Sequence, residues 1–200
     1  VNTNLEEIVL ARTAELEKSN ADLQLQVTER IKAEQLQKAL YKITELTNAN
    51  IKLDEFLAQI HLTVSELMYA ENLFIALLNV HEDQINFPYY FDTSGQTGHS
   101  RPYNSELPYA GLTERVLSSG KSFLYSKTTP TQNFPGRGHE PESWIGVPLK
   151  NQSSTFGVLA VQSYQLDHTF SEQDLHLLRY VGRHIATAIM RRKDASDIRE

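Results

Sequence analysis

The chain contains no cysteine among its 200 residues. Without a thiol it forms no disulfide, holds no cysteine-ligated zinc or iron–sulfur cluster, and carries out no thiol chemistry. A chromophore attached through a thioether bond is excluded for the same reason. The identity of a cofactor, if the chain uses one, stays unknown.

Glycine and proline are missing from the first 87 residues. All seven prolines lie at or after Pro88, and all nine glycines lie at or after Gly95. Because both residues interrupt regular structure, the chain divides into a helix-compatible front and a turn-rich back. The stretch without glycine or proline continues through the first helix and the first strand expected in the globular back. We therefore place the boundary between the two parts earlier, near residues 48–53.

Long apolar runs and a basic surface are also missing. No apolar run approaches the roughly 20 residues that span a bilayer, so we expect no membrane contact by this segment itself. The formal net charge is −6, which disfavours a nucleic-acid partner. The chain begins with Val1, and both its ends are polar and helix-compatible. We therefore expect it to be a piece of a larger protein.

Residues 5–48 are rich in strong helix formers. Apolar residues recur at near-heptad spacing and form a narrow stripe, which suits a seam between two helices better than packing on a broad core. We expect a parallel homodimeric coiled coil, and a single solvated helix is the alternative because polar residues interrupt the stripe. The predicted seam residues are Leu5, Val9, Leu16, Leu23, Val27, Leu36, Leu40 and Ile43.

The back alternates helical and strand patterns. The nearly continuous apolar run at 72–80 predicts a buried strand, and Pro88 predicts an edge position or a bulge in the strand that follows. Ser171 or Thr169 is a candidate cap for the last helix, and the cations at 191–193 suit the dipole at its C-terminal end. Helices are expected at 54–68, 112–117 and 171–193, strands at 72–80, 84–91, 121–125, 144–149 and 155–164, and loops at 92–108 and 128–143.

Three segments give the back a resemblance to the GAF domain family over residues 53–192. They are "GLTERVLSSGKSFLYS", "SWIGVPLKNQSSTFGVLAVQSY" and "FSEQDLHLLRYVGRHIATAI". The resemblance implies an α+β fold, in which an antiparallel five- to six-stranded sheet carries the N- and C-terminal helices on one face. It also implies a small-molecule pocket between the other face and the loops.

The front resembles the signalling-helix linker of bacterial receptors through "RTAEL" at 12–16 and "ERIKAE" at 29–34. Together the two resemblances imply a cytoplasmic fragment of a multidomain sensor, including the cytoplasmic part of a membrane-anchored receptor. The sensor would be a histidine kinase of a two-component system or a GGDEF-type diguanylate cyclase, with a covalently linked output domain outside this chain. The expected domains are a signalling-helix coiled coil at 1–50, a GAF sensor domain at 51–193, and the start of a linker at 194–200.

Much of the chemistry known in the GAF family does not fit these residues. Covalent bilin attachment and the free methionine sulfoxide reductases of this fold both rely on cysteine. Phe170 and Asp174 match parts of the cyclic-nucleotide signature, but no Asn-Lys pair precedes them and Leu175 replaces the acidic residue. No histidines pair at metal-ligand spacing and no serine lies in a nucleophile elbow. We therefore expect neither a metal site nor an enzyme activity.

Aromatic and charged residues gather in the sheet edge and the loops expected to border the pocket. Ligand pockets are mostly apolar with a few convergent polar groups, so these residues favour a small anionic or aromatic ligand. Ordinary aromatic packing is the alternative. We expect a regulatory sensor that binds such a ligand or relays a signal through a dimeric coiled coil; a ligand-free dimerisation and relay module is the rival. The candidate ligand-binding residues are Tyr90, Arg101, Tyr109, Tyr125, Arg137, His139 and Trp144.

Overall fold

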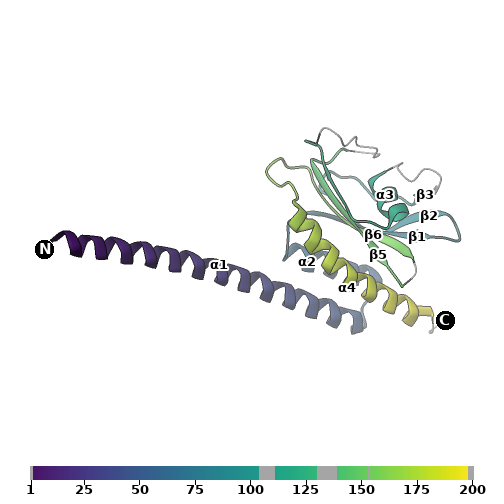
Figure 1. The fold of residues 1–200 in the computed structure, drawn as a ribbon. Helices are drawn as coiled ribbons and strands as arrows, with labels where there is room; N and C mark the ends of the chain where they lie inside the picture. The colour runs from purple at the N-terminus through teal and green to yellow at the C-terminus, as the bar shows by residue number, and fades with distance from the viewer. Residues whose placement is uncertain (1, 104–110, 130–138, 153, 198–200) are drawn as a thin grey trace. The chain divides into compact units, whose positions relative to one another are not determined.

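The computed structural model describes residues 2–103, 111–129, 139–152 and 154–197 (Figure 1). The chain divides into two compact units, Val1–Lys38 and Ala39–Glu200. One helix, α1 (Asn2–Asn48), makes up the first unit and enters the second. Its length follows from the absence of glycine and proline in this part of the sequence.

In a single chain, the side chains of α1 from residue 4 to residue 35 are exposed. The predicted seam residues are among them, with Leu5 61%, Leu16 69% and Leu23 56% exposed. Val9 and Val27 are also more than half exposed, whereas Leu36 and Leu40 are half-buried. Other exposed apolar residues lie on the remaining sides of this helix: Ile8, Leu10, Leu25 and Ile31.

The second unit is built on one antiparallel sheet. Its strands are β1 (Asn72–Asn79), β2 (Gln84–Phe91), β3 (Arg101–Pro102), β4 (Phe123–Ser126), β5 (Ser143–Lys150) and β6 (Thr155–Ser163). They lie in the order β3-β2-β1-β6-β5-β4, and each neighbouring pair is antiparallel. The central strands β1 and β6 and the neighbouring β5 are mostly buried, because both of their faces are covered.

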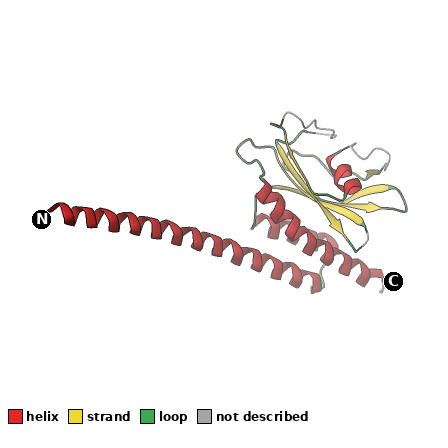
Figure 2. Cartoon of the chain, viewed as in Figure 1, coloured by secondary structure: helices red, strands yellow, loops and turns green. Residues whose placement is uncertain are grey.

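Helices cover the two faces of the sheet unequally (Figures 1 and 2). On one face lie α2 (Leu53–Ser65) and α4 (Glu172–Asp197), and on the other lies the short α3 (Leu112–Ser119). The last turns of α1 belong to the same unit, where Ile43 is only 2% exposed. Ile43, which the sequence places in the dimer seam, is therefore already covered in a single chain. The predicted α+β fold with both terminal helices on one face is confirmed.

Local patterns account for several element boundaries. Ile75 pairs with Tyr89, and Leu77 pairs with Asn86. Two residues of β2, one of them Pro88, therefore lie opposite one residue of β1, which confirms the predicted bulge. Ser171 and Asp174 form a capping box at the start of α4, in which the Ser171 N–H donates to the Asp174 carboxylate at 2.8 Å.

Several element boundaries shift by a few residues: α2 ends at Ser65 rather than at 68, α3 ends at Ser119 rather than at 117, and β4 begins at Phe123 rather than at 121. Two differences are larger. The expected loop at 92–108 contains β3, which pairs with Gln84 and Ile85. Two residues are too few to show an alternating pattern, so this strand left no periodic signal. The last helix continues past residue 193 to Asp197.

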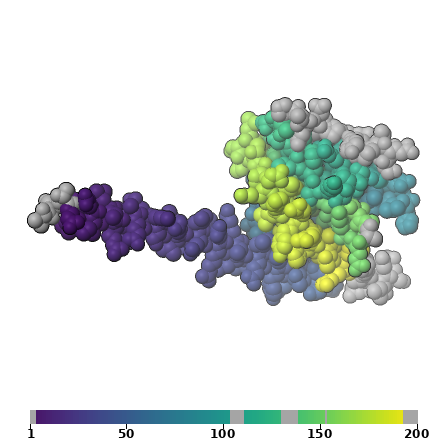
Figure 3. All heavy atoms as spheres, viewed as in Figure 1, coloured from purple at the N-terminus to yellow at the C-terminus, as the bar shows by residue number. Residues whose placement is uncertain are grey.

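The surface of α4 stays open to solvent along its length, as the space-filling view shows in yellow-green (Figure 3). Its residues Arg179, Arg183 and Thr187 are exposed, while Leu178, Val181, Ile185 and Ile189 are buried. The hydropathy of every described helix stays below what a membrane span requires.

Candidate functional site

A cavity of about 80 Å³ lies on the face of the sheet that carries α3. Strands β1, β2, β3, β5 and β6 and the first turn of α3 all contribute to its wall. Such convergence of separate elements is typical of a ligand pocket. Three features make up the wall: aromatic rings, one ion pair, and a network of hydrogen bonds.

The aromatic part of the wall comes from β1, β2 and β5. Phe74 and Tyr90 are cross-strand partners, and their rings stack at a centroid distance of 5.3 Å. Phe87 lies edge-on to both rings, at 5.7 and 5.8 Å. Trp144 is 2% exposed and lies against Gly146, where an added Cβ would be only 2.0 Å from the indole. The glycine thus makes room for the largest side chain of the cavity.

The ion pair joins β3 to the start of α3. Arg101 Nε donates to Glu114 Oε1 at 2.8 Å, and a second guanidinium nitrogen donates to Oε2 at 3.3 Å. The Glu114 side chain is only 9% exposed, against 32% for Arg101. The guanidinium also lies 4.9 Å from the centroid of the Phe87 ring. Both charges are therefore neutralised inside the protein.

Hydrogen bonds hold the end of β2 against the end of β6. The Asp92 carboxylate accepts bonds from the Tyr164 hydroxyl at 2.8 Å and from the Gln162 amide. Gln96 donates to the Tyr164 oxygen at 3.0 Å. Burial raises the pKa of Tyr164 above its ordinary value, and the Asp92 charge adds to the effect. Tyr164 is thus a protonated donor at neutral pH, and its ring lies 5.2 Å from that of His139.

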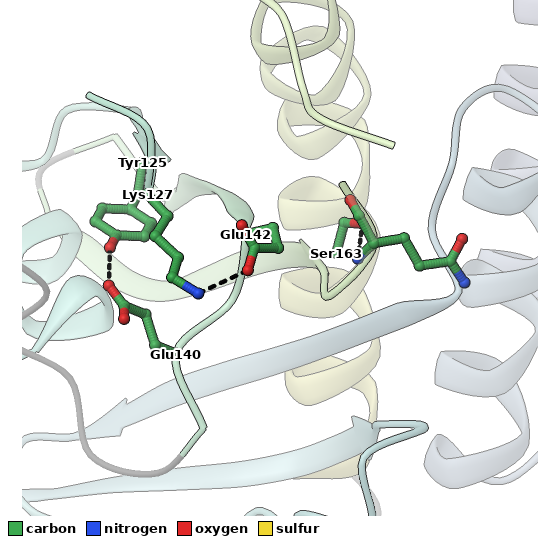
Figure 4. Close-up of polar contacts among 6 residues, drawn as sticks. Tyr125, Lys127, Glu140, Glu142 and Ser163 are labelled. Atoms are coloured by element: carbon green, nitrogen blue, oxygen red, sulfur yellow. Dashed lines mark hydrogen bonds and ion pairs between the residues drawn. The ribbon is translucent and has the colours of Figure 1, made fainter. Parts of the chain in front are cut away.

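A second set of polar contacts fixes the segment that brings His139 to the cavity (Figure 4). The Tyr125 hydroxyl donates to Glu140, and Lys127 pairs with Glu142 at 2.7 Å. Burial raises the pKa of Tyr125, and the neighbouring Glu140 raises it further. Tyr125 is 1% exposed and belongs to the core beneath α3, so it supports the wall without lining the cavity.

The structure brings together four of the seven candidate ligand contacts. Tyr90, Arg101, His139 and Trp144 line the cavity, and Tyr125 packs behind it. The other two candidates, Tyr109 and Arg137, lie outside the described residues. In the described part of the chain, no cluster of three or more histidine or acidic side chains is placed to hold a metal ion.

Sequence reasoning missed other members of the wall: Gln96, Glu114, Gln162 and Tyr164, with Asp92 behind them. Alternation along β6 could have found Gln162. Val158, Ala160 and Gln162 alternate along the strand, and the first two belong to the cluster beneath α3. The role of Glu114 depends on β3, which the sequence did not reveal.

Comparison with known proteins gives one family. A family model described as "GAF domain" matches residues 51–190. The GAF domain of a phosphoenolpyruvate-protein phosphotransferase from Coxiella burnetii superposes with a TM-score of 0.64 at 16% identity, covering 82% of this chain and 98% of that one. No curated protein matches the sequence.

Two further solved structures show the same fold. A free methionine-R-sulfoxide reductase from Neisseria meningitidis, in complex with its substrate, has a TM-score of 0.63 at 16% identity, covering 80% of this chain and 91% of that one. The GAF domain of a two-component sensor histidine kinase from Bacillus halodurans has a TM-score of 0.57 at 18% identity, covering 72% and 98%. At these identities the likeness concerns the fold alone.

Proposed function

Because the chain belongs to the GAF domain family, we propose that it is a regulatory sensor module that binds a small ligand between the sheet and α3. GAF domains are sensory and regulatory modules of signalling proteins. The observation that carries the proposal is the cavity itself, where an aromatic wall, a buried ion pair and a fixed polar network converge.

The size of the cavity favours a small ligand. Its volume of about 80 Å³ is well below the roughly 300–1,000 Å³ of sites for drug-sized molecules. A metabolite with few heavy atoms fits the described walls better than a cyclic nucleotide or a tetrapyrrole does. The Neisseria reductase, whose structure contains its substrate, is a protein of the same fold that takes a small molecule.

The charges of the wall favour a neutral or zwitterionic ligand. The sequence had favoured an anionic or aromatic one, with Arg101 as its cation. That guanidinium already makes two hydrogen bonds to Glu114, and an anion would have to break them. A zwitterion presents both charges and can add to the pair without separating it.

The proposed module is regulatory and carries out no catalysis of its own. The family resemblance implies that the methionine sulfoxide reductases of this fold rely on cysteine, and this chain has none. We further propose that it forms a homodimer through α1, in which apolar residues that are exposed in a single chain, such as Leu16 and Leu23, pack against a second copy. A linked output domain, of the histidine kinase or diguanylate cyclase type, would receive the signal on the cytoplasmic side.

A ligand-free relay is the second candidate function, and one observation favours it. Tyr125 and Trp144 are 1% and 2% exposed, and Phe74 stacks on Tyr90. These rings already fill much of the space beneath α3. In this alternative the aromatic cluster holds the domain rigid, and the signal passes through the helices alone.

Calorimetric titration decides between the two functions. The probes are free amino acids as zwitterions, short-chain carboxylates as anions, and small amides as neutral molecules. Thr113 lines the cavity and is 4% exposed, so Thr113→Leu should fill the cavity and abolish binding. Thr187 is exposed on α4, and Thr187→Leu should bind like the parent. No binding by any probe class supports the relay, and equal binding by both variants rejects this site.

A further inference from the structure

Arg192 joins the end of α4 to the segment between α1 and α2. One guanidinium nitrogen, Nη1, donates to the carbonyl oxygen of Leu46 at 2.8 Å and to that of Ala49 at 3.0 Å. The other, Nη2, donates to the carbonyl of Ile51. A single side chain thus binds three backbone oxygens that lie more than 140 residues away in the sequence.

The Leu46 carbonyl lies in the last turn of α1, where it also accepts a bond from the Ala49 N–H at 3.3 Å, and the carbonyls of Ala49 and Ile51 lie just beyond the helix. The last four carbonyl oxygens of a helix do not receive the regular hydrogen bond from an N–H four residues later in the helix. In α1 no basic side chain of the last turn can take that place. The sequence after Asn48 also has no glycine that could close the helix in a left-handed conformation. A cation at the C-terminal end of a helix is favoured by the helix dipole. For α1 that cation is supplied by α4.

The same guanidinium also contacts α2. Its central carbon lies 4.8 Å from the centroid of the Phe56 ring, and Phe56 is fully buried. By contrast, the ion pair between Lys42 of α1 and Glu66, the residue after α2, spans 3.3 Å, and its side chains are 36% and 62% exposed. Exposed pairs contribute little, so the contacts of Arg192 are the stronger link among these helices.

The link reaches the sheet through α4. This helix packs on β5 so closely that a Cβ on Gly182 would lie 2.9 Å from Val147. Trp144, three residues before Val147 in the same strand, lies on the cavity wall. One strand therefore carries the cavity on one face and, on the other, the helix that contains Arg192.

We propose that Arg192 is the positioning residue that couples α4 to the α1–α2 junction. A displacement of α4 moves the guanidinium of Arg192. Because this group is hydrogen-bonded to the three carbonyl oxygens, the displacement also moves the last turn of α1 and the segment that follows it. An arginine is required because its planar fork presents several donors at fixed angles, which a lysine does not. The regulatory meaning of this coupling rests on the proposed relay function, whereas the coupling itself is a property of a single chain.

Hydrogen exchange of the ligand-free chain gives the first test. Charge-assisted hydrogen bonds contribute enough that Arg192→Met should accelerate exchange of the Ala49 amide about tenfold to a hundredfold. That amide bonds to Glu45 in the last turn of α1. Arg192→Lys should recover part of the protection, and Arg191→Met, which changes an exposed neighbour, should leave the rate unchanged. Equal acceleration in both methionine variants, or in the core amides of β6 as well, overturns the proposal.

Spin-label distances give the second test, and the absence of cysteine allows specific labelling. Labels at Glu45→Cys and Thr187→Cys report on the last turns of α1 and on α4. In the Arg192→Met background the distance distribution should broaden or shift, and with Arg191→Met it should not. A distribution unchanged by Arg192→Met makes Arg192 a helix cap alone and overturns the coupling. Neither measurement depends on a ligand or on dimerisation, so failure here and failure of the sensor function are separate results.

Discussion

Replacing Gly146 with alanine should destabilise the domain at the wall of the cavity. The new Cβ would lie 2.0 Å from one indole atom of Trp144 and 2.7 and 2.8 Å from two others. Carbon atoms in contact are about 3.5–4.0 Å apart. Trp144 is 2% exposed, so the indole can relieve this overlap only by giving up its packing and moving toward the cavity that it lines.

The size of the effect follows from this overlap. Relieving the shortest contact requires a shift of roughly 1.5 Å, and Gly146 is held between Phe123 of β4 and Ala160 of β6. Overpacking of a core costs about 1–3 kcal/mol, and we expect the upper end because the backbone is paired on both sides. The lower chain entropy of unfolded alanine returns up to about 1 kcal/mol. The net loss of unfolding free energy should thus be about 2 kcal/mol.

Urea unfolding measures this loss, and Trp144, the only tryptophan of the chain, reports it by fluorescence. Gly182→Ala is the matched control, because its clash with Val147 is milder at 2.9 Å and alanine is favoured in a helix by about 1 kcal/mol. In a Trp144→Phe background, where unfolding is followed by circular dichroism because the tryptophan is gone, Gly146→Ala should lower the free energy of unfolding by a smaller amount. A loss below about 0.5 kcal/mol, within the scatter of neutral surface changes, or an equal loss in the phenylalanine background, refutes the steric argument.

Three further predictions concern other parts of the chain. Burial lowers the pKa of His61; since the unfolded chain then binds the proton more readily, stability should fall as the pH drops below about 6.5. Urea midpoints that keep the same pH dependence in His61→Gln would contradict this. Leu23→Asp should convert a dimer into a monomer by light scattering, while Leu25→Asp, exposed but outside the seam, should not; equal masses would reject the seam. Ser171→Ala should cost about 1 kcal/mol in urea unfolding because it removes the capping box with Asp174, and an unchanged midpoint would show that the cap contributes nothing.

Much of the fold could be predicted because its signals are local. The apolar run that became β1, the proline at the bulge in β2 and the serine that caps α4 each act within a few residues. Strand β3 could not be predicted in this way. Its two residues take their conformation from pairing with Gln84 and Ile85 rather than from their own pattern.

The candidate site was only partly predictable, for a related reason. Tyr90 and Trp144 were found because large aromatic residues stand out by type. Glu114 was missed because its partner Arg101 lies on the unpredicted strand. Gln162 has a polar side chain of ordinary type, and only the register of β6 directs it into the cavity.

The role of Arg192 differs between the prediction and the structure because of a tertiary contact. The sequence assigns the cluster at 191–193 to the dipole of its own helix, which is a local argument. In the structure α4 continues past the cluster, and the Arg192 guanidinium binds carbonyl oxygens at the end of α1. The physical principle is the same, but the helix that it stabilises is a different one.

The indole resonance of Trp144 tests the central claim most directly. A single tryptophan gives one indole N–H signal in a ¹⁵N-correlated spectrum, and this ring lines the cavity. Titration with the amino acid, carboxylate and amide probes should shift that signal in the parent for at least one neutral or zwitterionic compound. The same compound should leave it unmoved in Thr113→Leu. If no probe moves the signal, or if it moves equally in Thr113→Leu, the cavity is not a ligand site and the sensor function is wrong.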